Sequence, residues 1–256
     1  SIEELEGTDC VFLFGANRTE AHHVTGAKIK QLFMKGIESI VVDPVKTELA
    51  QIAKFHLQLR PGTNVALLNM MAYYIIEANL VNSDFIQKFT ERYSEFKAQV
   101  VSLNMDELEE ITGVSKSMVK EAALTYARSK NAMEFHGLGV TEHFQGSKTV
   151  MLLSDLAMMT GHIGRPSVGL NPLRGQNNVQ GAADMGCQPH QGAGYLDSYD
   201  PEINKKYSDF YKVKIPIGKG MKIPEMYDAS INGKLKALWL MGEDNVQTDP
   251  NTQHVM

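Results

Sequence analysis

The stretch Cys10-Val11-Phe12-Leu13-Phe14-Gly15-Ala16-Asn17 decides the fold class. An unbroken apolar run that ends in a glycine is typical of a parallel strand buried on both faces. A helical segment from about His22 to Lys35 follows, Gly36 is a suitable residue to end it, and a second apolar run occupies Ser39–Asp43. Strand, helix and strand at this spacing predict a right-handed βαβ unit.

The rest of the chain continues this alternation of short apolar runs and helical segments. We expect a strand at 56–59, a helix at 65–79, a short helix capped by Ser83, helical structure within 108–128 with Ser115 as a cap, a strand at 132–135, a helix at 147–160, a helix near 225–230 and a strand at 235–240. Residues 161–194 are rich in Gly, Asn, Gln and Pro, a composition typical of functional loops or domain crossings. The pattern predicts a three-layer αβα doubly wound domain with a mostly parallel sheet over residues 1–175, and the start of a second α/β domain over 176–256.

Charge and composition exclude several classes of protein. The chain has 256 residues and a net charge of −5, which argues against nucleic acid as the main partner. No apolar run reaches the roughly 18 residues of a transmembrane helix, so we expect no membrane span. The acidic start, Ser1–Leu5, lacks the pattern of a signal peptide. Because the chain begins without Met and stops just after a loop, we expect an internal piece of a longer protein.

Cysteine and histidine usage limits redox and metal chemistry within this chain. Cys10 and Cys187 lie far apart and form no disulfide framework, which fits a reducing compartment such as the cytoplasm. They are also too few to hold an iron–sulfur cluster. The eight histidines do not cluster at the spacing of metal ligands, so we expect no metal site. The fourteen methionines and Trp239 are expected in the core.

The loop Phe14-Gly15-Ala16-Asn17 and the acid Asp43 follow neighbouring predicted strands. Ligands of doubly wound folds lie beyond the carboxyl ends of the strands, where a glycine lets the backbone approach a phosphate and an acid accepts hydrogen bonds from a ribose. The full Gly-x-Gly-x-x-Gly signature is absent. A plain turn with a helix cap therefore stays an open alternative at Gly15.

Two further loops have the same character. The segments Pro61–Asn64 and His136–Thr141 place Gly62 and Gly139 after predicted strands. Thr63 or Asn64 is equally suited to cap the next helix. Several such loops at successive strand ends favour a rim that binds an extended, phosphate-bearing ligand.

The segment Leu173–Gly186 combines a permanent cation, several side-chain amides and three glycines. Arg174 is able to hold a carboxylate through two parallel hydrogen bonds, and amides such as Gln176 offer donors and acceptors to a pterin edge. The alternative is a solvated loop with a surface arginine. The sequence contains no Gly-x-Ser-x-Gly elbow, Walker loop or His-Glu-x-x-His pair, which excludes three common enzyme classes.

The Arg174–Gly186 segment closely resembles the corresponding stretch of molybdopterin-dependent formate dehydrogenase catalytic subunits. The resemblance spans nearly the whole chain, in the order Phe14–Asn17, Asp43–Lys46, Gly62–Asn69, Ile111–Ser115, Gly137–Thr141, Leu156–Gly161, Asn171–Gly186 and Met241–Asp244. The arginine segment is highly specific, whereas the strand-end glycines are shared with the wider family of pterin oxidoreductases.

The resemblance implies a cofactor and a site. In that family two molybdopterin guanine dinucleotides bind one molybdenum or tungsten, a 4Fe-4S cluster outside the region of this chain carries electrons away, and formate is oxidised to carbon dioxide. Arg174 matches the family's substrate-binding, catalytic arginine, with Gly175 and Gln176 beside the cofactor. The expected residues of one dinucleotide's site are Gly15, Asn17, Asp43, Lys46, Gly62, Asn64, Gly139 and Thr141. Residues 1–175 are the expected dinucleotide-binding domain. Gly242 and Asp244, which lie beyond it, match the start of the second dinucleotide's site.

The chain departs from the complete family enzyme in three ways. It has no Cys-x-x-Cys cluster region, no Cys-His or selenocysteine-His metal-ligand pair, and no final cofactor-capping domain. Neither Cys10 nor Cys187 matches the metal ligand. We therefore expect the chain alone to be inactive.

Alternatives and partners follow from the same resemblance. The alternatives are a nitrate or sulfur-compound reductase, a non-catalytic electron-transfer scaffold of the same fold and, less favoured, a nicotinamide-binding module. The expected partners are formate and the electron-transfer subunits of a formate dehydrogenase or hydrogenlyase complex.

Overall fold

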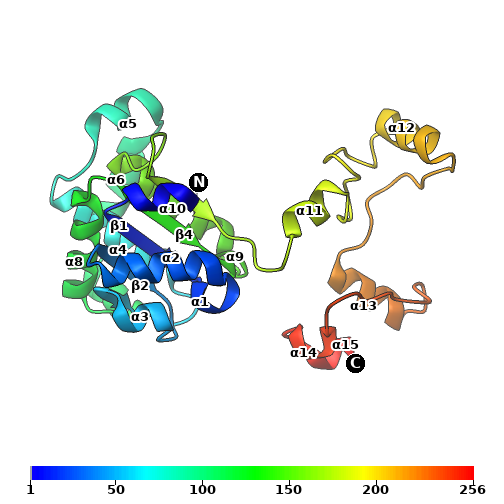
Figure 1. The fold of residues 1–256 in the computed structure, drawn as a ribbon, viewed down its shortest axis with the longest axis horizontal. Coiled ribbons are helices and arrows are strands. Elements are labelled where there is room, and N and C mark those ends of the chain that lie inside the picture. The colour runs from blue at the N-terminus through cyan, green and yellow to red at the C-terminus, as the bar shows by residue number, and fades with distance from the viewer. Residues whose placement is uncertain (1) are drawn as a thin grey trace. The chain divides into compact units, whose positions relative to one another are not determined.

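The structure, a computed structural model, describes residues 2–256 and divides into two compact units, Ser1–Gly175 and Gln176–Met256. Figure 1 shows both units, and each is described by itself. No helix in the described residues is long and apolar enough to cross a membrane.

The first unit is built around a parallel sheet of five strands. They are β1 (Cys10–Phe14), β2 (Glu38–Val42), β3 (Phe55–Leu57), β4 (Ala132–His136) and β5 (Gly169–Pro172). The strand order is β3-β2-β1-β4-β5, and every neighbouring pair is parallel. The sheet therefore grows outward from β1 in one direction and then from β4 in the other, which is the doubly wound arrangement predicted from the sequence.

Helices connect the strands of this sheet (Figure 1, blue to green). They are η1 (Ile2–Gly7), α1 (Arg18–Ala21), α2 (His23–Met34), α3 (Glu48–Ile52), α4 (Asn64–Glu77), α5 (Ser83–Phe89), α6 (Tyr93–Val101), α7 (Met105–Thr112), α8 (Lys116–Arg128), α9 (Leu138–Thr141) and α10 (Gly146–Thr160). The predicted helices at 22–35, 65–79 and 147–160 correspond to α2, α4 and α10.

Two hydrophobic cores make the unit three-layered. Successive side chains of a strand point to opposite faces, so Phe12 and Phe14 pack with α4 and α8 while Val11 and Leu13 pack with α2 and α3. The layered α/β fold and its parallel sheet are thereby confirmed.

Local details differ from the sequence prediction at two helix starts. Asn82, rather than Ser83, caps α5 by accepting a hydrogen bond from the Phe85 amide at 2.9 Å. Ser115 caps α8 as predicted, by accepting from the Met118 amide. Neither Thr63 nor Asn64 caps α4; the Thr63 hydroxyl instead donates to the Arg60 carbonyl at 2.7 Å.

The second unit contains helices in its described residues. They are α11 (Val179–Asp184), α12 (Pro201–Tyr211), α13 (Ile223–Ile231), α14 (Asn245–Thr248) and α15 (Thr252–Val255). The predicted strand at 235–240 is wrong: these residues pair with no neighbouring strand in the described part of the unit. Without a partner strand the apolar run stays irregular, and Trp239, predicted to be core, is 90% exposed.

Candidate functional site

The site lies at the carboxyl ends of β1 and β4, where the strand order reverses. In doubly wound folds this reversal opens a crevice, because the connections after the two strands leave in opposite directions. Gly15 follows β1 and Gly137 follows β4, so the predicted glycine loops flank this point.

The loops after β1 and β4 pack backbone against backbone. The Gly139 amide donates to the Gly15 carbonyl at 3.1 Å, and the Gly137 amide donates to the Phe14 carbonyl at 3.2 Å. A Cβ on Gly139 would lie 2.8 Å from the Gly15 Cα, and Gly15 itself has a φ of +56°. Only glycine fits at both positions, and the amides of Gly15, Gly137 and Gly139 all donate to backbone carbonyls, so these turns fix the two loops against each other.

Two cavities open along these strand ends. We call the first the arginine cavity; it measures about 150 Å³, and its lining residues are Gly15–Arg18, Ala21, His22, Gly137–Gly139 and Leu173–Gly175. We call the second the aspartate cavity; it measures about 260 Å³, and its lining residues are Phe14, Gly15, Asn17, Val42–Pro44, Leu59, Pro61, Asn64, Gly139 and His143. Gly15, Asn17 and Gly139 line both, so the cavities adjoin, and we call the two together the strand-end groove.

Asp43 and Asn64 supply polar groups to the aspartate cavity. The Asp43 carboxylate accepts a hydrogen bond from the Val45 amide at 2.8 Å, and its partial burial raises its pKa from the ordinary value. Asn64 is buried, and its amide reaches the Gly139 carbonyl at 3.4 Å, which ties the start of α4 to the glycine loop. The aspartate cavity thus combines one acid with a fixed glycine turn.

Arg174 lines the arginine cavity, and its loop is anchored from two sides. Its backbone carbonyl hydrogen bonds to His22 Nε2, and the amide of the preceding Leu173 donates to the His136 carbonyl at 2.9 Å. Arg174 itself is exposed to solvent. The loop is therefore held by its backbone while the guanidinium stays accessible.

His22 and Arg18 are site residues that the sequence reasoning missed. Burial and then the nearby charge of Arg18 lower the pKa of His22, so the imidazole is neutral at pH 7. Arg18 is only 2% exposed, and burial lowers its pKa to about 10. Its Nε and Nη1 atoms have no hydrogen-bond partner among the described residues. An arginine directly after a glycine turn suggests a solvated side chain, so only the burial identifies it.

Three predicted site residues of the first unit lie outside the strand-end groove, and three more belong to the second unit. Lys46, Gly62 and Thr141 are exposed and line neither of its cavities. The other three, Gln176, Gly242 and Asp244, belong to the second unit. In that unit Asp244 lines a separate cavity of about 710 Å³ together with Tyr227 and His254. The role of all six stays a prediction.

A cluster of buried polar residues lies between β4 and α8. Glu134 of β4 is 1% exposed and accepts a hydrogen bond from the Tyr126 hydroxyl, while its Oε2 has no partner among the described residues. Burial raises the pKa of Glu134 to about 8. The Tyr126 carbonyl accepts a hydrogen bond from His162 Nε2 at 3.1 Å. The cluster lines none of the cavities described above.

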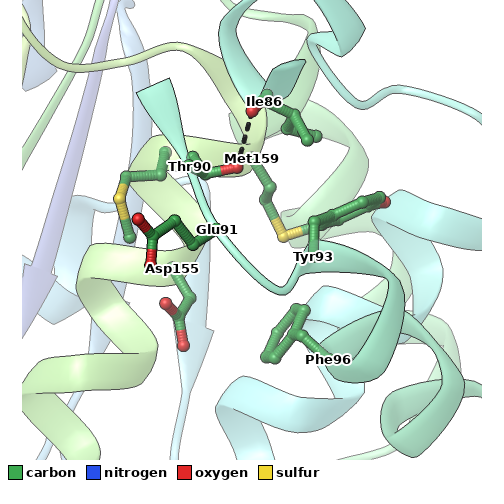
Figure 2. Close-up of a pocket in the computed structure, with 8 residues that line it drawn as sticks. Ile86, Thr90, Glu91, Tyr93, Phe96, Asp155 and Met159 are labelled. Carbon is green, nitrogen blue, oxygen red and sulfur yellow. Dashed lines mark hydrogen bonds between the residues drawn. The ribbon is translucent and has the colours of Figure 1, made fainter. Parts of the chain in front are cut away.

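A smaller cavity of about 50 Å³ lies between α5, α6 and α10 (Figure 2). Figure 2 shows the side chains of Tyr93 and Phe96 beside Met159, and the Thr90 hydroxyl donating to the Ile86 carbonyl at 2.7 Å. Burial raises the pKa of Asp155 on its wall. None of the predicted site residues lines this cavity, and it is much smaller than the strand-end groove.

The residues present suit a phosphate-bearing ligand better than a metal ion. The unpartnered nitrogens of the buried Arg18 fit an oxyanion. The described residues contain no group of three or more His, Cys, Asp or Glu side chains suited to a metal. Cys10 is buried within β1, and burial raises its pKa to about 12, so its thiol is no metal ligand.

Comparison with known proteins places the chain in a family. The family model for molybdopterin oxidoreductases matches residues 1–256. The chain is 41% identical over 250 residues to formate dehydrogenase H of Escherichia coli, covering 97% of the chain and 35% of that protein. It is 39% identical to the F420-dependent formate dehydrogenase subunit alpha of Methanocaldococcus jannaschii, covering 100% of the chain and 37% of that protein. The chain thus spans little more than a third of the length of these relatives.

A solved structure shares the fold. Acetylene hydratase from Pelobacter acetylenicus superposes with a TM-score of 0.63 at 20% identity, covering 87% of this chain and 33% of the other. This likeness supports the architecture alone. The match of the family model to residues 1–256 establishes that the chain belongs to the molybdopterin oxidoreductase family.

Proposed function

We propose that the protein containing this chain is a formate dehydrogenase, and that this chain binds one pterin guanine dinucleotide along the strand-end groove and positions formate with Arg174. The observation that carries the proposal is the anchored Arg174 loop at one end of a groove lined by Gly15 and Gly139. The formate dehydrogenase relatives and the intact Arg174–Gly186 segment support this activity over other reactions.

Three features of the groove support binding of an extended dinucleotide. Gly15 and Gly139 line both cavities and carry no side chain that would narrow them for a phosphate. The Asp43 carboxylate is placed to accept hydrogen bonds from ribose hydroxyls. Asn64 fixes the turn between them through the Gly139 carbonyl.

Arg174 acts on the substrate by charge and geometry. When bound, the molybdenum or tungsten centre supplies the two-electron oxidation of formate to carbon dioxide. The guanidinium donates two parallel hydrogen bonds to the formate carboxylate and so fixes its orientation. Through its bond to the Arg174 carbonyl, His22 holds the backbone from which this side chain projects.

The wider assignment extends beyond this chain. We infer two guanine dinucleotides, with Gly242 and Asp244 contacting the second, a 4Fe-4S cluster outside the chain, and electron-transfer subunits as partners in the cytoplasm. Residues 1–175 serve as the dinucleotide-binding domain. Gln176, Lys46, Gly62 and Thr141 join the cofactor site of the complete protein.

The experiment that tests the proposal uses the full-length protein. Purified protein is assayed for bound pterin and metal, and formate, nitrate and thiosulfate are compared as substrates with an artificial electron carrier. We expect formate-dependent reduction of the carrier, and a fall in kcat/KM of roughly 100-fold in Arg174→Ala, because two charge-assisted hydrogen bonds are lost. Arg128→Ala, which removes an exposed arginine on α8, is the matched control. Normal formate turnover by Arg174→Ala, or a preference for nitrate or thiosulfate, would reject the proposal.

A further inference from the structure

Arg18 is a buried cation whose guanidinium lacks a counter-ion among the described residues. The residue is 2% exposed, and two of its guanidinium nitrogens have no hydrogen-bond partner among the described residues. A guanidinium stays charged at any physiological pH, and taking a charge out of water without a counter-ion is costly. A buried arginine in this state indicates a missing anion.

The surroundings of Arg18 are suited to such an anion. Of the described residues that line the arginine cavity, none is acidic, and Arg174 adds a second positive charge. The Gly15, Gly137 and Gly139 turns on its wall pack against each other by backbone, so the two arginines are the charged groups among the described residues that line it. A cavity of about 150 Å³ accommodates a phosphate-sized group.

We propose that Arg18 binds a phosphate of the dinucleotide that lies in the strand-end groove, as a cofactor-binding residue of this chain. This inference rests on the proposed function. A resident cofactor suits Arg18 better than a substrate does, because a buried cation is destabilising whenever its site is empty. A substrate leaves the site in every turnover, and the exposed Arg174 loses little when that happens.

The test compares Arg18→Met and Arg18→Lys with wild type in the full-length protein. Methionine removes the charge at similar length, whereas lysine keeps the charge and loses the planar fork. Arg128→Met is the matched control, because Arg128 lines a different cavity beside Asp9 and Glu38, where the strands begin. The measurements are pterin content after gel filtration, the rate of pterin loss, the KM for formate of the loaded fraction, and the melting temperature with and without cofactor.

We expect the pterin of Arg18→Met to dissociate roughly 10- to 100-fold faster, as loss of a charge-assisted hydrogen bond predicts. The KM for formate of the loaded fraction stays within about 2-fold, since Arg174 is intact. Arg18→Lys loses pterin at an intermediate rate. The melting temperature of Arg18→Met falls in the loaded protein and rises in the empty protein, a change of sign that a purely structural arginine would not produce.

Three results would overturn the inference. One is pterin loss at the wild-type rate in both Arg18 variants. Another is a large rise in the KM for formate with pterin retained, which would assign Arg18 to the substrate. If wild-type protein contains no pterin, the proposed function fails, and inorganic diphosphate then tests Arg18 independently. Diphosphate should raise the melting temperature of the wild type, raise that of Arg18→Lys by less and leave that of Arg18→Met unchanged, and an equal rise in all three would be the third contrary result.

Discussion

The buried carboxyl of Glu134 makes the stability of the protein depend on pH. In the folded protein the pKa of Glu134 is about 8, against an ordinary value of 4.5, because its burial disfavours the charged form. Between these values the folded chain holds a proton that the unfolded chain has released. Stability is therefore fully present below the ordinary pKa and is lost as the pH rises through the folded pKa.

The size of this effect follows from the shift. Each pH unit within the window lowers the free energy of unfolding by roughly 1.4 kcal/mol, which amounts to on the order of 4 kcal/mol between pH 5 and pH 8. Glu134→Gln is neutral at every pH and keeps an oxygen that accepts from the Tyr126 hydroxyl. It should match wild type near pH 5 and be more stable near pH 8.

The assay is urea unfolding of the full-length protein at both pH values, followed by its fluorescence. Burial keeps the pKa of Tyr126 well above its usual range, so its hydroxyl stays protonated. Burial lowers the pKa of His162 to about 4 from 6.5, which gives a pH dependence of opposite sign below pH 6.5, but it is the same in wild type and Glu134→Gln and cancels in their comparison. Glu121→Gln, which changes an exposed carboxyl of α8, is the control. An advantage of Glu134→Gln that is the same at pH 5 and pH 8 would refute the reasoning.

The remaining predictions concern the strand-end groove. Gly139→Ala places a Cβ 2.8 Å from the Gly15 backbone and should destabilise the protein by about 1–3 kcal/mol and lower its pterin content. Gly36→Ala, which meets no atom within 4 Å, should retain pterin; equal pterin loss in both would contradict the packing argument. His22→Leu removes the bond to the Arg174 carbonyl and should raise the KM for formate by roughly 3- to 10-fold with pterin retained; an unchanged KM would show that the loop needs no such anchor. Asp43→Asn should lose pterin roughly 10-fold faster than wild type in gel filtration, whereas the control Asp84→Asn on α5 should not. Equal rates of pterin loss in both variants would show that Asp43 does not bind the ribose.

Much of the fold was predictable from stretches whose residue pattern fits only one kind of secondary structure. The apolar run Cys10–Phe14 has no solvent-facing side, so a strand buried on both faces was the expected result, and β1 is the centre of the sheet. The edge strand β5 was missed because Gly169–Pro172 is short, ends in proline and has no apolar run. The apolar residues 235–240 failed as a strand because strand formation needs a partner, which local sequence does not reveal.

The site residues whose place depends on backbone geometry were predictable from the sequence. Those whose role depends on burial by distant parts of the chain were less so. Glycines after strands indicated the positions of Gly15 and Gly139, since only glycine allows their close approach. Arg18 was missed because its burial depends on how α1 packs, which no local pattern encodes. Lys46 and Thr141 carried suitable chemistry but lie outside the groove in this structure.

The most direct test of the central claim is an experimental density map of the complete, cofactor-loaded protein. The account predicts dinucleotide density along the strand-end groove, with a phosphate beside Arg18, a ribose beside Asp43 and the metal end facing Arg174. Density for the dinucleotide elsewhere, for example at the cavity between α5, α6 and α10, with the Gly15 and Gly139 turns uncontacted, would contradict it.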